Sequence, residues 1–202
     1  MNYKIISTGS KGNCVIINDV MVDVGVPFGK IKNELYDIKY LLITHVHSDH
    51  LNIKTIQQVA ENFPRIKIIG NYEVHDFYNC NIIANAGFEI VTDDYVFTPF
   101  QCVHDVLCYG FTWTFEDQEI IYATDSSTLE HAPKKKYDWL FLESNHDEQK
   151  LEQVRNVQKG SYNPYLSGKR HLSTQQAKAF FYLNRRNDES QFIELHQSSR
   201  FY

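Results

Sequence analysis

Hydrophobic residues in this chain occur mainly in short runs between polar or glycine-containing segments, a pattern typical of β-strands. In the first half, these runs predict strands at residues 3–6, 15–17, 20–24, 40–44 and 66–69. In the second half, they predict strands at residues 89–91, 95–103, 111–115, 119–123, 139–142 and 192–195. No repeat or low-complexity linker separates the strands, so the pattern indicates no domain boundary.

Helices are expected between several of these strands. Asn52 and Asn71 can act as N-caps, and the apolar residues after Asn52 recur at helical spacing. A capping box at Ser173 and Gln176 opens a helix that would reach residue 183, and residues 31–35 form a shorter candidate. Helices that fall between strands predict an α/β layered domain with the helices outside a sheet core. We expect one domain over residues 1–202.

The composition is that of a soluble globular protein. The chain has 202 residues, of which 43% are hydrophobic and 22% are charged. No apolar run approaches the roughly 18 residues that a membrane span requires, and the first residues lack the features of an export signal. The four cysteines include no CxxC pair, which favours reduced thiols. We therefore expect a cytoplasmic protein without a membrane segment.

The charge of the chain is unevenly distributed. The net charge of -5 argues against generic nucleic-acid binding, but residues 150–186 contain eight basic residues and one acidic residue, Glu152. A protein that is acidic overall can still present a basic face to a phosphate backbone. An ordinary solvated surface is the alternative interpretation of this segment.

The strand at residues 40–44 is followed at once by a dense group of metal-binding side chains. His45, His47, Asp49 and His50 lie within six residues. Imidazole and carboxylate groups suit zinc, manganese or iron, and the absence of cysteine here argues against a closed structural zinc site. A His-rich surface loop is the alternative, but a loop directly after a buried strand favours a metal site.

Similar side chains follow other predicted strands. His104, Asp125, Glu143 and His196 come after strands, and His171 precedes the capping box at Ser173. A two-metal hydrolytic site with three ligands for each ion and one bridging carboxylate needs seven protein groups, which this chain can supply. Each residue also has an alternative role in the structure rather than in metal binding. His104 and His196 could be buried core residues, Asp125 could be a turn or N-cap residue, and His171 could be an ordinary residue at a helix N-terminus.

The segment HVHSDH matches the H-x-H-x-D-H signature of the metallo-β-lactamase superfamily, and VDVG around Asp23 resembles the aspartate motif that precedes it. This resemblance implies an αββα four-layer sandwich with metals at one edge, between the two sheets. It implies seven ligands for two divalent ions, with zinc expected first and manganese as the alternative: His45, His47 and His104 for one ion, Asp49, His50 and His196 for the other, and Asp125 bridging both. Asp23 would support the site through hydrogen bonds.

The later segments LESNHD, GKRHLSTQQA and LHQSSRFY resemble the small WalJ/YycJ-type exonucleases and the tRNase Z-like phosphodiesterases of this superfamily. In that branch a glutamate and a histidine work together, and the histidine protonates the leaving oxygen. The corresponding residues here are Glu143 and His171. Asp49, Glu143 and His171 are therefore the expected catalytic residues.

Two features differ from these relatives. Only seventeen residues separate Asp125 from Glu143, which leaves no room for the arm of tRNase Z or for a large inserted domain. The sequence also ends six residues after His196, which could leave the last strand exposed or covered by another subunit, as in a homodimer.

The sequence thus predicts a dinuclear metal-dependent phosphodiesterase, a nuclease that hydrolyses DNA or RNA. Ser10, Asn13 and Ser199 are candidate phosphate contacts. A cyclic-nucleotide phosphodiesterase and a thioesterase or lactonase on the same scaffold are alternatives, and a non-catalytic metal-binding protein is a further one. Glu143 with His171 favours phosphodiesters, because a thioester or lactone needs no such acid.

Overall fold

The structure is a computed structural model that describes residues 1–157, 163–198 and 201. The chain forms two compact units, which we call unit 1 (Met1–Asn85) and unit 2 (Ala86–Tyr202). Each unit contains one six-stranded sheet. The expectation of a single domain over residues 1–202 stays a prediction.

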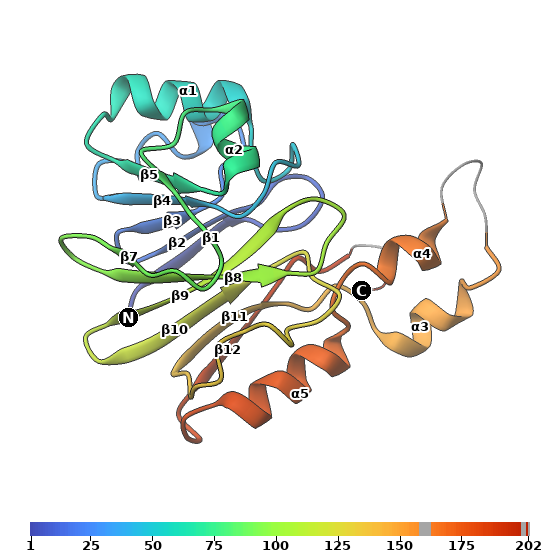
Figure 1. Ribbon diagram of the computed structural model, residues 1–202. Coiled ribbons are helices and arrows are strands. Elements are labelled where there is room, and N and C mark those ends of the chain that lie inside the picture. The colour runs from blue at the N-terminus through green and yellow to red at the C-terminus, as the bar shows by residue number, and fades with distance from the viewer. Residues whose placement is uncertain (158–162, 199–200, 202) are drawn as a thin grey trace. The chain divides into compact units, whose positions relative to one another are not determined.

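The sheet of unit 1 combines antiparallel and parallel strands in the order β1-β2-β3-β4-β5-β6 (Figure 1). β1, β2 and β3 pair antiparallel, and β3 to β6 pair parallel. The strands are β1 (Tyr3–Ser7), β2 (Cys14–Ile17), β3 (Val20–Val22), β4 (Tyr40–Ile43), β5 (Lys67–Gly70) and β6 (Ile82–Ile83). All four residues of β4 are buried, as expected for a continuous apolar run in the middle of a parallel arrangement.

Three helical segments accompany this sheet, namely η1 (Phe28–Lys30), α1 (Ile53–Asn62) and α2 (Tyr72–Phe77). Asn52 and Asn71 cap α1 and α2 through their side-chain oxygens, as the sequence predicts. Ile56 and Val59 of α1 join the same hydrophobic core as Leu41 of β4. The expected helix at residues 31–35 is wrong: the residues after η1 form consecutive turns. Hydrogen bonds over three residues, such as Glu34 N to Ile31 O, outnumber bonds over four residues, such as Leu35 N to Ile31 O, so no regular α-helix develops.

The sheet of unit 2 has the order β12-β11-β10-β9-β8-β7. β7 to β10 pair antiparallel, and β10, β11 and β12 pair parallel. The strands are β7 (Ile90–Val91), β8 (Val96–Cys102), β9 (Cys108–Phe115), β10 (Gln118–Ala123), β11 (Trp139–Glu143) and β12 (Gln191–Leu195). β10, β11 and β12 run in the same direction, so the residues that follow them emerge at one edge of this sheet.

Unit 2 has three helices, α3 (Glu148–Gln153), α4 (Pro164–Gly168) and α5 (Thr174–Asn184). The capping box at Ser173 and Gln176 opens α5, as the sequence predicts. Phe180 and Phe181 of α5 pack against the core around Leu140 and Leu142 of β11. The helices α3 and α4, which the sequence pattern did not predict, project away from this sheet (Figure 1).

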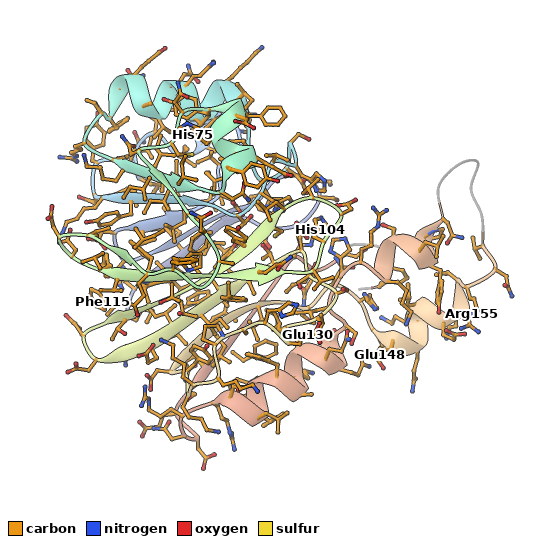
Figure 2. The ribbon with its side chains drawn as sticks, in the orientation of Figure 1. His75, His104, Phe115, Glu130, Glu148 and Arg155 are labelled. Carbon is orange, nitrogen blue, oxygen red and sulfur yellow. The ribbon has the colours of Figure 1, made fainter. Side chains whose placement is uncertain are left out.

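The described basic residues between positions 150 and 186 lie on several elements of unit 2. Some lie around α3 and α4 and others at the end of α5, and Figure 2 places Arg155 on the projecting part. Lys159 lies outside the described residues. Several arginines pair with nearby carboxylates: Arg155 with Glu152, Arg170 with Asp105, Arg185 with Asp188 and Arg186 with Asp138. Much of the local positive charge is therefore already paired.

Among the described residues, no helix has the length and apolar character needed to cross a membrane.

Candidate functional site

The loop between β4 and α1 carries the histidine-rich motif of unit 1. His45 and His50 are fully buried, and their ring centroids lie 4.1 Å apart. The rings of His45 and His47 lie 4.7 Å apart in an edge-on arrangement. The backbone folds back here, because His50 N donates to His47 O across 2.9 Å. One short loop therefore gathers three imidazoles and the carboxylate of Asp49.

Asp23 follows β3 and is fully buried with a positive φ of 62°. Its Oδ2 lies 2.7 Å from His50 Nδ1, and its Oδ1 accepts a hydrogen bond from Thr44 N across 2.8 Å. Since a carboxylate only accepts hydrogen bonds, His50 Nδ1 carries the proton and His50 Nε2 carries the lone pair. Asp23 thus presents His50 in the tautomer that a metal ion requires at Nε2.

In unit 2, four candidate groups converge from different elements. Asp125 follows β10, Glu143 ends β11, His171 precedes α5 and His196 follows β12. One potential ligand atom from each of these residues lies within 4.8 Å of the others. Asp125 and His196 have positive φ values of 53° and 52°. Such backbone conformations turn the chain sharply, within two residues of the end of β10 and directly after β12.

Glu143 occupies the centre of this cluster and is fully buried. Its Oε1 lies 2.6 Å from His171 Nδ1 and 2.8 Å from His196 Nδ1. Its Oε2 accepts hydrogen bonds from Ser126 N and Leu172 N, across 3.1 and 3.3 Å. Burial alone would raise the pKa of Glu143, but the charge of His171 and the hydrogen bonds from both histidines hold it below its usual value.

His171 lies beside two carboxylates. Its Nδ1 is 3.1 Å from Asp125 Oδ1 in addition to the contact with Glu143. Burial would lower the pKa of His171, but the charge of Glu143 and the hydrogen bonds that His171 donates to Asp125 and Glu143 outweigh this effect and raise it to about 10. The cluster therefore favours the protonated, cationic form of His171.

His104 lies in the loop after β8 (Figure 2). Its ring centroid is 5.6 Å from that of His171. Its Nε2 is 3.1 Å from Asp105 Oδ1, and Asp105 also pairs with Arg170, the residue before His171. The ion pair between Arg170 and Asp105 holds the loop after β8 against the segment that carries His171.

Three supporting residues of the site were not predicted from the sequence. Thr44 Oγ1 contacts both carboxylate oxygens of Asp23 and lies 3.0 Å from His45 Nδ1. Asn145 Nδ2 donates to His196 O across 3.0 Å, and Arg170 binds Asp105. Thr44 directly precedes HVHSDH and Asn145 lies within LESNHD. Their positions in or beside these motifs are the sequence signal that could have identified them. No sequence signal pointed to the pairing of Arg170 with Asp105.

The candidate phosphate contacts have different environments. Ser10 is exposed, Asn13 is 1% exposed, and Ser199 lies outside the described residues. The other predicted residues form two groups. In unit 1 they are Asp23, His45, His47, Asp49 and His50, and in unit 2 they are His104, Asp125, Glu143, His171 and His196.

The donor chemistry of both groups fits divalent zinc or manganese. Imidazole nitrogens and carboxylate oxygens are the usual ligands of these ions, and buried carboxylates orient the histidines in each unit.

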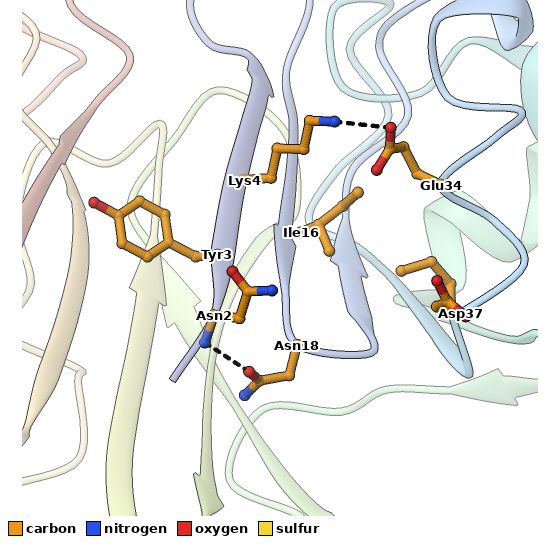
Figure 3. A pocket seen from close by; sticks show the side chains of 8 residues that line it. Asn2, Tyr3, Lys4, Ile16, Asn18, Glu34 and Asp37 are labelled. Atoms are coloured by element: carbon orange, nitrogen blue, oxygen red, sulfur yellow. Dashed lines mark hydrogen bonds and ion pairs between the residues drawn. The ribbon is translucent and has the colours of Figure 1, made fainter.

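A separate pocket of about 280 Å³ lies beside the β1 edge of unit 1. Figure 3 shows the ion pair between Lys4 and Glu34 and the hydrogen bond from Asn2 N to Asn18 at its wall. None of the predicted site residues lines this pocket. It is therefore distinct from the histidine-rich loop.

No protein-family model matches the sequence, and no curated protein matches it either. Solved structures do match. The metallo-β-lactamase fold protein YhfI from Bacillus subtilis is 17% identical, with 97% of this chain and 85% of that chain covered and a TM-score of 0.72. The short form of human tRNase Z is 15% identical, with 99% and 94% covered and a TM-score of 0.74.

A diphosphatase from the PhnP family is also similar, at 15% identity, with 97% of this chain and 85% of that chain covered and a TM-score of 0.65. These similarities extend over nearly the whole chain and include both six-stranded sheets. They confirm the fold class that the HVHSDH and VDVG motifs predict. This chain has the metallo-β-lactamase fold.

Proposed function

We propose that this protein is a dinuclear metal-dependent hydrolase, and specifically a nuclease that cleaves phosphodiester bonds of DNA or RNA. The observation that carries the proposal is the contact of 2.6 Å between Glu143 and His171, in a cluster with Asp125. This pair is a proton donor of the kind that a poor leaving group, such as the sugar oxygen of a nucleic acid, requires.

The proposed ligands belong to both groups. The assignment of both groups to one dinuclear centre rests on the motif resemblance: His45, His47 and His104 for one ion, Asp49, His50 and His196 for the other, and Asp125 between them. Zinc is the expected metal and manganese the alternative. The ions would supply an activated water and neutralise charge on the phosphate.

The residues of the chain then have separate tasks. Asp23 orients His50 through the contact of 2.7 Å at Nδ1. Glu143 orients His171 and favours its protonated form, which would donate a proton to the leaving oxygen. Because Glu143 also contacts His196, one buried carboxylate would orient both a metal ligand and the proton donor.

Three points support a phosphodiester over other substrates of this fold. A carboxylate–imidazolium pair has no clear task in thioester or lactone hydrolysis, because those leaving groups depart without a general acid that protonates them. Human tRNase Z and a PhnP-family diphosphatase, both named for phosphorus-containing substrates, share the fold. Lys150, Lys169 and other cationic side chains lie around the segment that leads to His171 and could contact backbone phosphates.

Ser10 and Ser199 remain candidate phosphate contacts. A homodimer in the cytoplasm remains the proposed form of the protein.

The test combines metal analysis with a substrate panel. Purified protein is analysed for bound metal and then assayed on labelled single-stranded DNA, double-stranded DNA, RNA and cyclic nucleotides. The double variant Asp49→Ala/His50→Ala should lose cleavage and bound metal while its circular dichroism spectrum stays native. His131→Ala is the matched control, because His131 is an exposed histidine with a side-chain exposure of 49%.

The outcomes separate the alternatives. Cleavage of nucleic acid by the wild-type protein and by His131→Ala, but not by the double variant, supports the proposal. Full activity in the double variant would contradict the two-metal mechanism. If only cyclic nucleotides were cleaved, the protein would be a cyclic-nucleotide phosphodiesterase rather than a nuclease, and the assignment of the site residues would stand.

A further inference from the structure

The loop between β1 and β2 brings a buried asparagine against the histidine-rich loop of unit 1. Asn13 is 1% exposed, and its backbone N donates to Asp49 O across 2.6 Å. Gly9 and Gly12 have φ values of 100° and 129°, which favour glycine. These turns place the Asn13 side chain beside His50.

Hydrogen bonds define the orientation of the Asn13 amide. Its Oδ1 accepts from Gly9 N across 2.7 Å, which directs Nδ2 to the other side. Nδ2 lies 3.2 Å from Gly9 O, 3.2 Å from Asp49 O and 2.8 Å from His50 Nε2. A flipped amide would place its NH₂ group against the N–H of Gly9, so only this orientation satisfies the contacts.

The partner atom on His50 is the nitrogen that a metal would use. Asp23 Oδ2 lies 2.7 Å from His50 Nδ1 and keeps the proton there, so the lone pair lies on Nε2. The N–H of Asn13 is therefore directed at the nitrogen lone pair that the proposed ion would need. A metal and this hydrogen bond cannot occupy one lone pair together.

We infer that the Asn13 amide competes with metal for His50 Nε2 and thereby sets the affinity of the ion held by Asp49 and His50. This inference rests on the metal centre proposed above. It gives Asn13 a task different from the phosphate contact suggested by the sequence, because both ends of its buried amide have partners within unit 1.

An ion can replace Asn13 at His50 Nε2 while the Asn13 amide keeps hydrogen-bond partners. Asn13 Nδ2 carries two hydrogens and faces three acceptors. When an ion takes His50 Nε2, the two carbonyl oxygens of Gly9 and Asp49 still satisfy both hydrogens. The side chain therefore keeps its place while its bond to His50 is exchanged for the ion.

The backbone holds the loop independently of this side chain. Asn13 N donates to Asp49 O, Gly25 N donates to Asn13 O across 2.9 Å, and Val24 N donates to His50 O across 2.9 Å. An alanine at position 13 keeps all three bonds. The variant Asn13→Ala should consequently fold and remove the competing donor while the ligands stay in place.

The experiment measures metal affinity without using catalysis. Chelator-treated wild-type protein and Asn13→Ala are titrated with Zn²⁺ against a competing chromophoric chelator. We expect one of the two ions to bind about 2- to 10-fold more tightly to the variant, the range that loss of one hydrogen bond implies. Asn81→Ala is the control, because Asn81 Oδ1 also accepts a hydrogen bond from a backbone amide, but that amide is Ile68 N of β5 rather than a group beside His50.

A second readout reports the hydrogen bond itself. In chelator-treated protein, ¹⁵N spectra of the imidazole rings should show His50 protonated at Nδ1, with an Nε2 shift that changes in Asn13→Ala and not in Asn81→Ala. Unchanged or weaker zinc affinity in a folded Asn13→Ala variant, or an unchanged Nε2 shift, overturns the inference. Failure of the wild-type protein to bind zinc or manganese overturns the proposed metal centre as well.

Discussion

The Nδ1 atom of His171 lies 2.6 Å from Oε1 of Glu143, and that carboxylate has no exposed surface. A buried carboxylate beside an imidazole stabilises the imidazolium form, and the pKa of His171 is raised to about 10 accordingly. The two residues are 28 positions apart in the sequence and meet because β11 and the segment before α5 lie together. This pair is the basis for the first prediction.

The variant His171→Ala should lose about 100-fold or more in kcat on nucleic acid, the usual contribution of a positioned general acid. The loss should be far smaller on bis(p-nitrophenyl) phosphate, because p-nitrophenolate leaves without protonation. Comparison of kcat for the two substrates, at equal bound metal, measures the effect. An equal loss on both substrates would assign His171 a structural or metal-binding task instead. Glu143→Gln should show the same selectivity, because it removes the charge that favours the His171 cation.

Asp23→Asn should weaken metal binding by about 10- to 100-fold, the usual effect of losing a carboxylate that orients a metal-bound histidine. Asp23 holds His50 at Nδ1 and also accepts from Thr44 N and Thr44 Oγ1. Chelator competition with Zn²⁺ gives the dissociation constants. Thr44→Ser keeps a hydroxyl at that position and should bind metal almost as the wild type does. Wild-type affinity in Asp23→Asn would exclude this orienting role.

Gly25→Ala should destabilise the protein by about 3 kcal/mol, because a small-to-large change in a tightly packed site forces the backbone to move. An added Cβ would lie 1.7 Å from Asp49 O and 2.8 Å from His50 N. The histidine loop would therefore have to shift, and metal affinity should fall with stability. Urea unfolding measures the change. Gly29→Ala is the control, since nothing lies within 4 Å of its added Cβ, and it should be nearly neutral.

The four cysteines, Cys14, Cys80, Cys102 and Cys108, are free and buried. Burial raises the pKa of the Cys80 thiol to about 11, and burial together with the nearby charge of Asp23 raises that of Cys14 further. Alkylation by iodoacetamide at pH 8 should therefore be slow in native protein and fast in urea, as mass spectrometry can measure. Rapid labelling of Cys14 under native conditions would contradict its burial.

The same pKa shifts imply a pH dependence. A thiol with a raised folded-state pKa stays neutral in the native protein at a pH at which the unfolded chain ionises. The stabilisation is fully present below the ordinary value of 9.0 and decreases as the pH rises from there towards 11. Urea midpoints measured between pH 8 and pH 10.5 should fall over this interval.

Local patterns in the sequence determined much of the fold and the identity of the candidate ligands. The apolar run of β4, one residue before HVHSDH, predicts a buried strand followed by the four ligand candidates, because these residues are neighbours in the chain. Asn52, Asn71 and the capping box at Ser173 mark helix starts for the same local reason. The metallo-β-lactamase fold followed from the short motifs.

Only the tertiary structure decided which atoms meet. Asn13 and His50 are 37 residues apart, so their contact cannot be recognised from the sequence. The sequence suggested a phosphate contact for Asn13, whereas the structure shows its amide directed at His50. The hydrogen bonds from both His171 and His196 to Glu143 likewise depend on the register of β11 and β12, whose parallel pairing puts Glu143 opposite Leu195. The helices α3 and α4 escaped prediction because they are short and carry no long apolar stripe. Motifs are local and can be recognised in the chain, whereas hydrogen-bond partners and tautomers result from long-range packing.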